Sequence, residues 1–142
     1  MKFLDTNIFL DAGSQAPEDR EKREIAAALI LPLDFAISTQ VVQEYIANAL
    51  GKKSLGLTES GVERTLDTLR AVPILPITFD LVLDAWSIRK RYGISQWDAS
   101  IIGAAKELHC ELLYTEDLNN GQTYDGVTVV NPFAVDASSS TG

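Results

Sequence analysis

Apolar positions along the chain follow two periods, one typical of strands and one typical of helices. Short apolar runs predict strands at residues 3–10 (closing in an acidic turn at Asp5), 34–38, 74–77, 112–114 and 127–130. Apolar residues at helical spacing predict helices at residues 18–31, 40–50, 58–70, 79–91 and 95–109. This alternation indicates an α/β fold, a small parallel sheet of four to five strands with helices on both faces. Spacing alone leaves the strand order open.

Capping residues set the expected helix boundaries. Pro32 should end the first predicted helix because proline cannot continue one. Thr39 is the expected N-cap of the second helix, and Gly51 its expected end. Residues 95–98, Ser-Gln-Trp-Asp, have the form of a capping box at the start of the last helix.

Length and composition describe one ordinary globular domain. The chain has 142 residues, of which 46% are hydrophobic and 23% charged. We expect a single domain over residues 1–135 and a flexible, small and polar tail over residues 136–142. No apolar run reaches about 18 residues, so no membrane span is expected. The start lacks the features of a signal peptide and the only cysteine is Cys110, which together predict cytoplasmic residence and no internal disulfide.

The net charge of −8 argues against a broad basic surface for nucleic acid. It leaves room for an enzyme that reaches phosphates through metal ions, because a bound cation reverses the local field. Two small basic clusters are present, at residues 52–53 and at residues 89–91. The second ends a predicted helix, so it either complements the helix dipole or contacts RNA.

Four acids far apart in sequence should converge at one edge of the predicted sheet. Asp5 follows the first strand and Asp117 the fourth, and parallel strands end at the same edge. Asp98 begins the helix that leads to the fourth strand, and Glu44 lies one turn into the helix that leaves the second.

Each of these acids also has a purely structural interpretation. Asp5 fits a turn cap, and Asp98 fits the capping box. Glu44 falls on the polar side of its helical wheel, which favours a solvated position, and Asp117 lies in a generic polar loop. The remaining acids are expected at the surface or in caps, and among them are Asp11, Asp34, Asp80, Asp84 and Asp125.

Four motifs, in order along the chain, resemble those of PIN-domain ribonucleases, most closely the VapC-type toxins of toxin–antitoxin pairs. They are FLDTN at residues 3–7, VVQEY at 41–45, QWDASII at 96–102 and LYTEDLNNGQ at 113–122. The resemblance implies a PIN-like three-layer fold. It also implies that the metal-binding and catalytic acids are Asp5, Glu44, Asp98 and Asp117, with Asn7 and Thr115 as supporting polar residues.

The same resemblance implies a metal-dependent endoribonuclease that cleaves RNA phosphodiester bonds and acts as a toxin. The expected cofactor is Mg²⁺ or Mn²⁺, since hard cations take oxygen ligands and relieve the repulsion among crowded carboxylates. We expect Asp5 and Asp98 to bind the metal directly, and Glu44 and Asp117 to bind directly or through water. The implied partners are an RNA substrate, an antitoxin protein that inserts a segment into the acidic cleft, and a second copy in a homodimer.

Two other functions compete with this one. A phosphatase with an aspartyl nucleophile would usually carry a second acid two residues after the first, where this chain has Asn7. A non-catalytic PIN-like module for RNA binding or dimerisation would not need a metal, so a Mn²⁺ titration distinguishes it from the nuclease.

Overall fold

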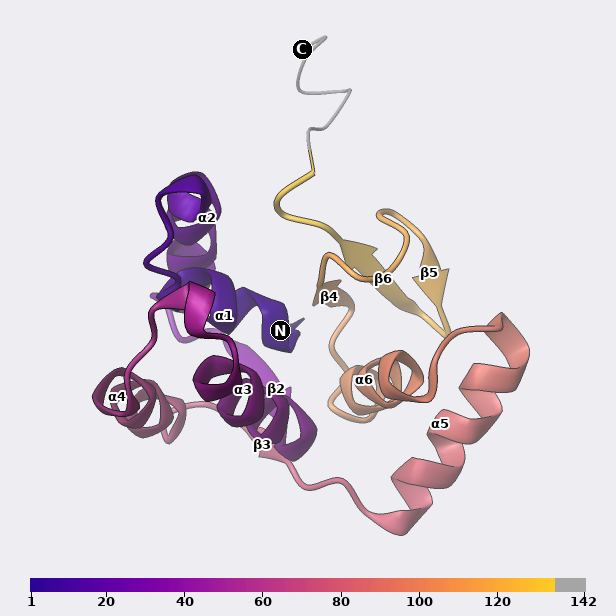
Figure 1. The fold of residues 1–142 in the computed structure, drawn as a ribbon. Coiled ribbons are helices and arrows are strands. Elements are labelled where there is room, and N and C mark those ends of the chain that lie inside the picture. The colour runs from indigo at the N-terminus through magenta and orange to yellow at the C-terminus, as the bar shows by residue number, and fades with distance from the viewer. Residues whose placement is uncertain (135–142) are drawn as a thin grey trace, which may run out of the picture.

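The structure of the chain is a computed structural model that describes residues 1–134. The predicted boundary at residue 135 and the predicted flexible tail over residues 136–142 lie outside the described residues. Figure 1 shows a twisted sheet with helices on both sides: α2 and α4 on one, α5 and α6 on the other. The predicted α/β architecture is therefore confirmed.

The sheet has six strands in the order β3-β2-β1-β4-β6-β5. All neighbouring pairs are parallel except β5 and β6, which are antiparallel. The count exceeds the predicted four to five because β5 has only two residues, too few to produce an alternating pattern. The strands are β1 (Lys2–Leu4), β2 (Phe35–Ser38), β3 (Ile74–Leu75), β4 (Leu112–Tyr114), β5 (Thr123–Tyr124) and β6 (Val127–Val130).

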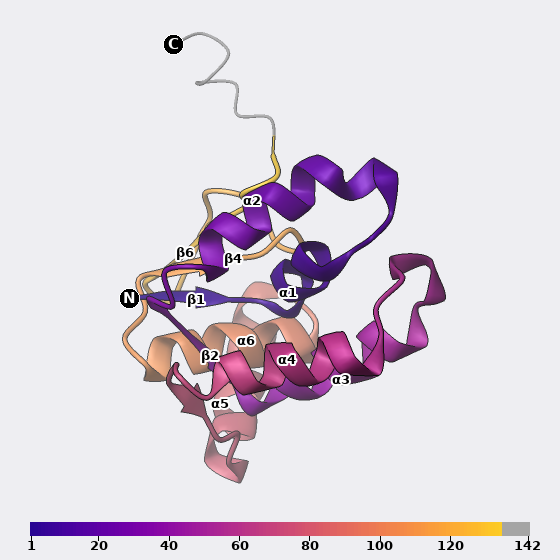
Figure 2. The ribbon, with the colours of Figure 1, turned by 90° about the vertical axis from the view of Figure 1, so that its left-hand side faces the viewer.

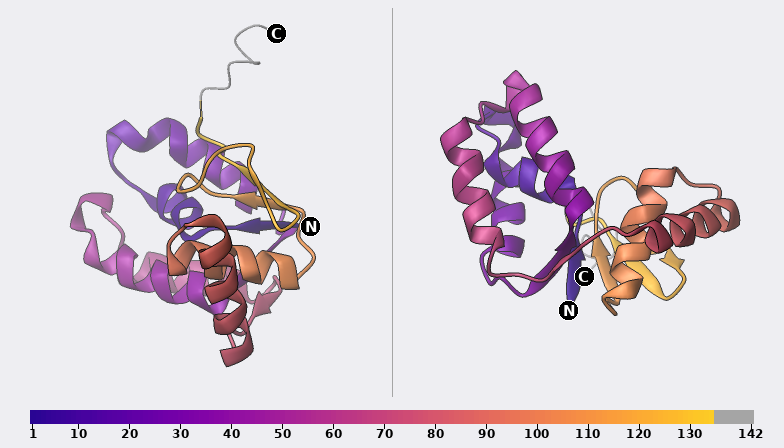
Figure 3. Two further views of the ribbon diagram at one scale, coloured as in Figure 1. Left: turned by 90° about the vertical axis from the view of Figure 1, so that its right-hand side faces the viewer. Right: turned by 90° about the horizontal axis from the view of Figure 1, so that it is seen from below.

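The described part of the chain forms six α-helices and two short 3₁₀ turns. The two views in Figure 3 show α5 crossing α6 on their side of the sheet. None of the helices within residues 1–134 is long and apolar enough to cross a bilayer. The helices are α1 (Thr6–Gly13), α2 (Arg20–Ile30), α3 (Thr39–Gly51), α4 (Glu59–Leu69), α5 (Phe79–Tyr92) and α6 (Gln96–Glu107), and the 3₁₀ turns are Pro17–Asp19 and Lys53–Leu55.

The prediction of strand and turn over residues 3–10 is wrong, because the strand ends at Leu4 and α1 begins at Thr6. Asp5 causes the change of structure. Its carboxylate accepts a hydrogen bond from the backbone N–H of Thr6 at 2.6 Å, so it caps a helix where a turn was predicted. Ile8 and Phe9 are buried on this helix.

The predicted N-cap of α3 is displaced by one residue. Ser38, rather than Thr39, is the N-cap, and its hydroxyl accepts from the N–H of Val41. The helix ends at Gly51, as predicted. The predicted cap of α6 is confirmed, since the hydroxyl of Ser95 accepts from the N–H of Asp98 at 3.1 Å.

The position of β1 at the centre of the sheet decides where the chemistry can gather. It pairs in parallel with β2 on one side and β4 on the other, with Leu4 opposite Tyr114. The N–H of Asp5 continues this ladder by donating to the carbonyl of Tyr114 at 3.0 Å. The residues that follow β1 and β4 are thus neighbours at the carboxyl edge, which lies beside α1 in Figure 2.

Packing around β1 fixes this edge rigidly. Phe3, Leu4 and Leu113 are fully buried in the central strands. Small residues on α6, among them Ala99 and Ala105, are buried where this helix packs against the sheet. Because close-packed interiors tolerate little movement, the side chains at the end of β1 are held in defined places.

Candidate active site

Asp5 is the most deeply buried acid of the predicted site, with 5% of its surface exposed. Its Oδ1 accepts from the N–H of Thr6 at 2.6 Å, and its Oδ2 accepts from the hydroxyl of Thr115 at 2.8 Å. Burial raises the pKa of Asp5 from 3.8 to about 6, although these two hydrogen bonds oppose the rise. The charges of Asp117 and Glu44 raise it further. Burial and the two neighbouring negative charges therefore oppose the ionisation of Asp5.

Glu44 reaches this site from α3 and is half-buried, so the expected solvated position is wrong. Its Oε2 accepts from the hydroxyl of Thr6, and its Oε1 from the amide of Gln40, both at 2.9 Å. The helical wheel could not reveal this, because Thr6 belongs to a different helix. Both carboxylate oxygens of Glu44 are held in a fixed orientation.

Thr115 and Asn7, predicted as supporting residues, join the site to the loop after β4. The hydroxyl of Thr115 donates to Asp5 and accepts from the N–H of Asp117 at 3.1 Å. The amide nitrogen of Asn7 donates to Oδ2 of Asp117 at 3.2 Å and lies 3.5 Å from the Thr115 hydroxyl. These two side chains therefore set the positions of Asp5 and Asp117 relative to each other.

Asp98 completes the group from the first turn of α6. Burial raises the pKa of its half-buried carboxyl, and the charges of Asp117 and Glu44 add to the rise. The same two acids act on Asp5, so all four predicted acids lie within electrostatic reach at one edge of the sheet. Their arrangement matches the convergence expected from the topology.

The donor set suits a hard divalent cation. Carboxylate and amide oxygens are the ligands that Mg²⁺ and Mn²⁺ prefer. The Oδ1 atom of Asn7, beside Asp117, is buried and has no hydrogen-bond partner, which leaves a further oxygen free. Within residues 1–134, no three acidic, histidine or cysteine side chains already form a metal-binding group. The residues thus fit a metal chemically, without forming a preassembled cage.

Replacing Thr115 with valine should weaken the site without removing an acid. Asp5 loses a hydrogen bond that lowers its pKa, so we expect that pKa to rise further. We expect the affinity for Mn²⁺ to fall about 10- to 100-fold, the usual cost of losing a group that orients a ligand. The pH at which Mn²⁺ binds should also move higher. Calorimetry that finds an unchanged pH dependence of Mn²⁺ binding in Thr115→Val would contradict this role.

A second acidic group, centred on Asp11, was not anticipated. Asp11 is half-buried on α1 beside Glu116, the neighbour of Asp117, and its Oδ2 has no hydrogen-bond partner. Burial and the charge of Glu116 raise the pKa of Asp11 from 3.8 to about 7. Lys22 of α2 pairs with Glu116 at 3.0 Å. The prediction of Asp11 as a surface or capping acid is therefore wrong.

Asp125 is likewise more than a surface acid. Arg91, Lys106 and the hydroxyl of Tyr92 all donate to its carboxylate. Hydrogen bonding from Arg91 lowers the pKa of Asp125 to about 2. Arg91 thus ties α5 to the turn before β6, which is a structural role for one member of the basic cluster at residues 89–91.

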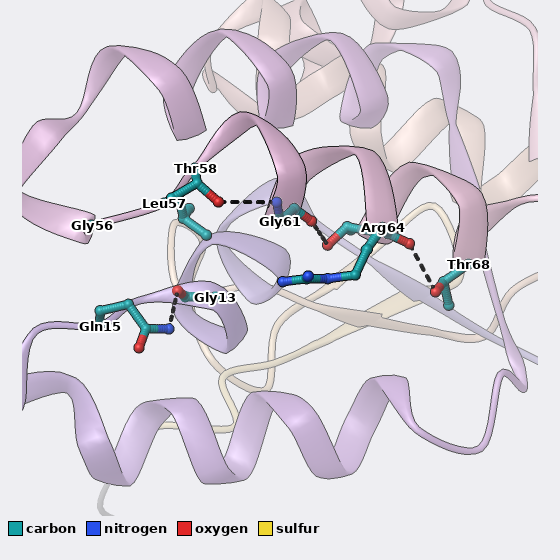
Figure 4. A pocket seen from close by; sticks show the side chains of 9 residues that line it. Gly13, Gln15, Gly56, Leu57, Thr58, Gly61, Arg64 and Thr68 are labelled. Atoms are coloured by element: carbon teal, nitrogen blue, oxygen red, sulfur yellow. Dashed lines mark hydrogen bonds between the residues drawn. The ribbon is translucent and has the colours of Figure 1, made fainter.

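Two hollows on the surface bear on the site. One, of about 910 Å³, lies between α3 and α6 and is lined by Glu44, Gln40 and Trp97 among others. The other, of about 560 Å³, lies beside α1 and α4, and Figure 4 shows Arg64 and Thr58 on its wall. None of the four acids lines the second hollow, so only the first is continuous with the site.

Comparison with known proteins agrees with this geometry. The family model described as the PIN domain matches residues 2–124. A search of curated proteins found no match.

Several solved structures share the fold. A toxin–antitoxin complex from Klebsiella pneumoniae is similar with a TM-score of 0.69 and 23% identity, covering 95% of this chain and 100% of that one. FitAB bound to an IR36 DNA fragment has a TM-score of 0.67 and 25% identity, covering 96% and 98%. Mycobacterium tuberculosis VapC20, a sarcin-ricin loop cleaving toxin, has a TM-score of 0.63 and 19% identity, covering 82% and 92%.

Proposed function

Because this chain belongs to the PIN-domain family, we propose that it is a metal-dependent endoribonuclease acting as the toxin of a toxin–antitoxin pair. PIN domains of the VapC type are nucleases, a class of hydrolase. The observation that carries the proposal is the gathering of Asp5, Glu44, Asp98 and Asp117 at the carboxyl edge of the sheet. The pKa values of Asp5 and Asp98 are raised by burial and by neighbouring charges, and carboxyl groups perturbed in this way are a common sign of function.

The proposed cofactor is Mg²⁺ or Mn²⁺. We propose that Asp5 and Asp98 hold it directly, with Glu44 and Asp117 binding directly or through water. The chemistry that such a cation supplies when bound is stabilisation of negative charge on the cleaved phosphate. Like-charge repulsion among the acids favours its binding, because a cation offsets that repulsion.

The residues around the acids act by orienting them. Thr6 and Gln40 fix both oxygens of Glu44, and Thr115 fixes Oδ2 of Asp5. The amide of Asn7 donates to Oδ2 of Asp117. Groups positioned in advance need no reorganisation when charge develops, which is the main source of electrostatic catalysis.

The proposal is tested by incubating the purified chain with single-stranded RNA and sequencing the new ends. We expect internal cleavage with Mg²⁺ or Mn²⁺, loss of cleavage in excess EDTA, and recovery when Mn²⁺ is restored. Cleavage that persists in EDTA would refute the metal dependence. Titration calorimetry with Mn²⁺ distinguishes the alternative, a non-catalytic module, because such a module would neither bind the metal nor require it.

The proposed protein partner is an antitoxin that inserts a segment into the acidic cleft and offers an arginine to the carboxylates. The net charge of −8 favours a basic segment there, because complementary charge guides association. Co-expression with the protein encoded next to this chain should yield a complex in which RNA cleavage is inhibited. The homodimer and cytoplasmic residence stay predictions, and sedimentation of the purified chain tests the first.

A further inference from the structure

We propose that the cleft between α3 and α6 holds an unpaired nucleobase of the RNA substrate, stacked on Trp97. This inference rests on the proposed nuclease function and names where substrate recognition occurs. The cleft measures about 910 Å³, within the usual range of roughly 300–1,000 Å³ for ligand sites. Glu44 lines it, so a nucleotide whose base enters the cleft lies beside one of the four acids.

Trp97 is placed to act as a stacking platform. Its side chain is 68% exposed although it adjoins Asp98 and lines the cleft. The amide of Gln40 donates both to the backbone carbonyl of Trp97 at 3.2 Å and to Glu44 at 2.9 Å. The side chain of Gln40 thus links the backbone of Trp97 to a site acid. Aromatic faces bind unpaired bases by stacking, whatever the base.

Charge selects a base over a phosphate as the occupant. The lining of the cleft contains no lysine or arginine among the described residues, and it contains the carboxylate of Glu44. A phosphate there would be repelled, whereas a neutral base would not. The apolar wall formed by Ile77, Val82 and Ala47 suits a flat ring equally well.

A residue that lines the cleft, Gln96, also carries a hydrogen-bond acceptor without a partner. Gln96 donates through its amide nitrogen to the carbonyl of Val82 at 3.4 Å, while its Oε1 is buried with no partner. Leaving a buried acceptor unpaired is costly, so a ligand N–H that reaches it is favoured. Base edges carry such N–H groups, and proteins read extruded bases through them.

The test uses the full chain and a single-stranded RNA that it cleaves, together with copies of that RNA carrying one abasic nucleotide near the cleaved bond. We expect Trp97→Ala to lower kcat/KM about tenfold to a hundredfold on the intact RNA. Trp97→Phe should keep most of the activity because it keeps a stacking face. Trp86→Ala is the matched control, since Trp86 is 49% exposed on α5 and does not line the cleft.

The abasic RNAs separate base binding from other effects. One abasic RNA should lack the base that enters the cleft, and the unaltered chain should cleave it with a low kcat/KM. On that RNA, Trp97→Ala should have the same kcat/KM as the unaltered chain. The inference would be overturned if, at every position, the losses in kcat/KM from Trp97→Ala and from removing the base were additive. Full activity of Trp97→Ala on the intact RNA would overturn it as well. So would a dimer that dissociates in Trp97→Ala, which would make the cleft an interface between copies. If the unaltered chain cleaves no RNA at all with Mn²⁺, the proposed function falls first and the inference with it.

Discussion

Asp5→Asn is expected to lower RNA cleavage at least about a hundredfold while leaving the fold intact. The change removes the charge of the most buried acid in the site and keeps its shape. The amide oxygen can still accept from the N–H of Thr6 and cap α1. The amide nitrogen then faces the hydroxyl of Thr115, which can turn to accept it.

Initial rates of cleavage with Mn²⁺, alongside thermal unfolding, measure this effect. Asp98→Asn should show the same loss, because its carboxylate belongs to the same group of charges. Asp84→Asn is the matched control, since Asp84 is exposed on α5 and is not among the charges that act on Asp5 or Asp98. Full activity in either site variant, with EDTA also without effect, would end the case for a metal-dependent nuclease.

The second large effect expected is a loss of stability with rising pH when metal is absent. Asp5 titrates near pH 6 in the folded chain and near its ordinary value of 3.8 when unfolded. Between these values the folded chain binds more protons, so its free energy of unfolding falls as pH rises. Stability from this group is fully present below pH 3.8 and is lost through pH 6. At about 1.4 kcal/mol per pKa unit, the loss between pH 4.5 and 7.5 is about 2 kcal/mol.

Urea unfolding of the unaltered chain and of Asp5→Asn, both in EDTA, isolates this term. The difference between their free energies of unfolding should shrink or reverse by about 2 kcal/mol from pH 4.5 to 7.5. Subtracting the variant removes the contributions of Asp11 and other acids that titrate in both chains. A difference that is constant with pH would show that Asp5 has an ordinary pKa.

The positions of the four acids could be predicted because they depend on topology, which leaves a clear trace in the sequence. Asp5 and Asp117 follow buried strands, and parallel strands end at one edge. Topology also placed Glu44 near this edge, although its helical wheel suggested a solvated position, and the resemblance then favoured a role at the site. Its partner Thr6 lies 38 residues away, so no local pattern could have revealed the contact.

The helix α1 was missed for a different reason. Asp5 lies at a junction where strand and helix meet with no linker, and an acid followed by Thr6 and Asn7 also fits a turn. The apolar residues Ile8 and Phe9 carry no period by themselves. The boundary between strand and helix is set by the pairing of β1 with β4, which stops at Leu4.

The environment of Asp11 could not be predicted from the sequence either. Its raised pKa depends on Glu116, which comes beside it only through the loop after β4. Short strands such as β5 leave too few residues for an alternating pattern, and the strand order follows from crossovers that spacing does not encode. Long-range contacts, rather than local propensities, account for each of these gaps.

The central place of β1 also sets the order in which the protein becomes complete during synthesis. Thr115 donates to Asp5 across 110 residues of chain, and no earlier segment replaces it. At about 5–20 residues per second, the ribosome needs roughly 5–20 s to make the intervening chain. Throughout that time the nascent chain has an N-terminal strand but no neighbour on its β4 side. A growing chain therefore carries no assembled acidic site until the segment that holds Thr115 and Asp117 has been translated.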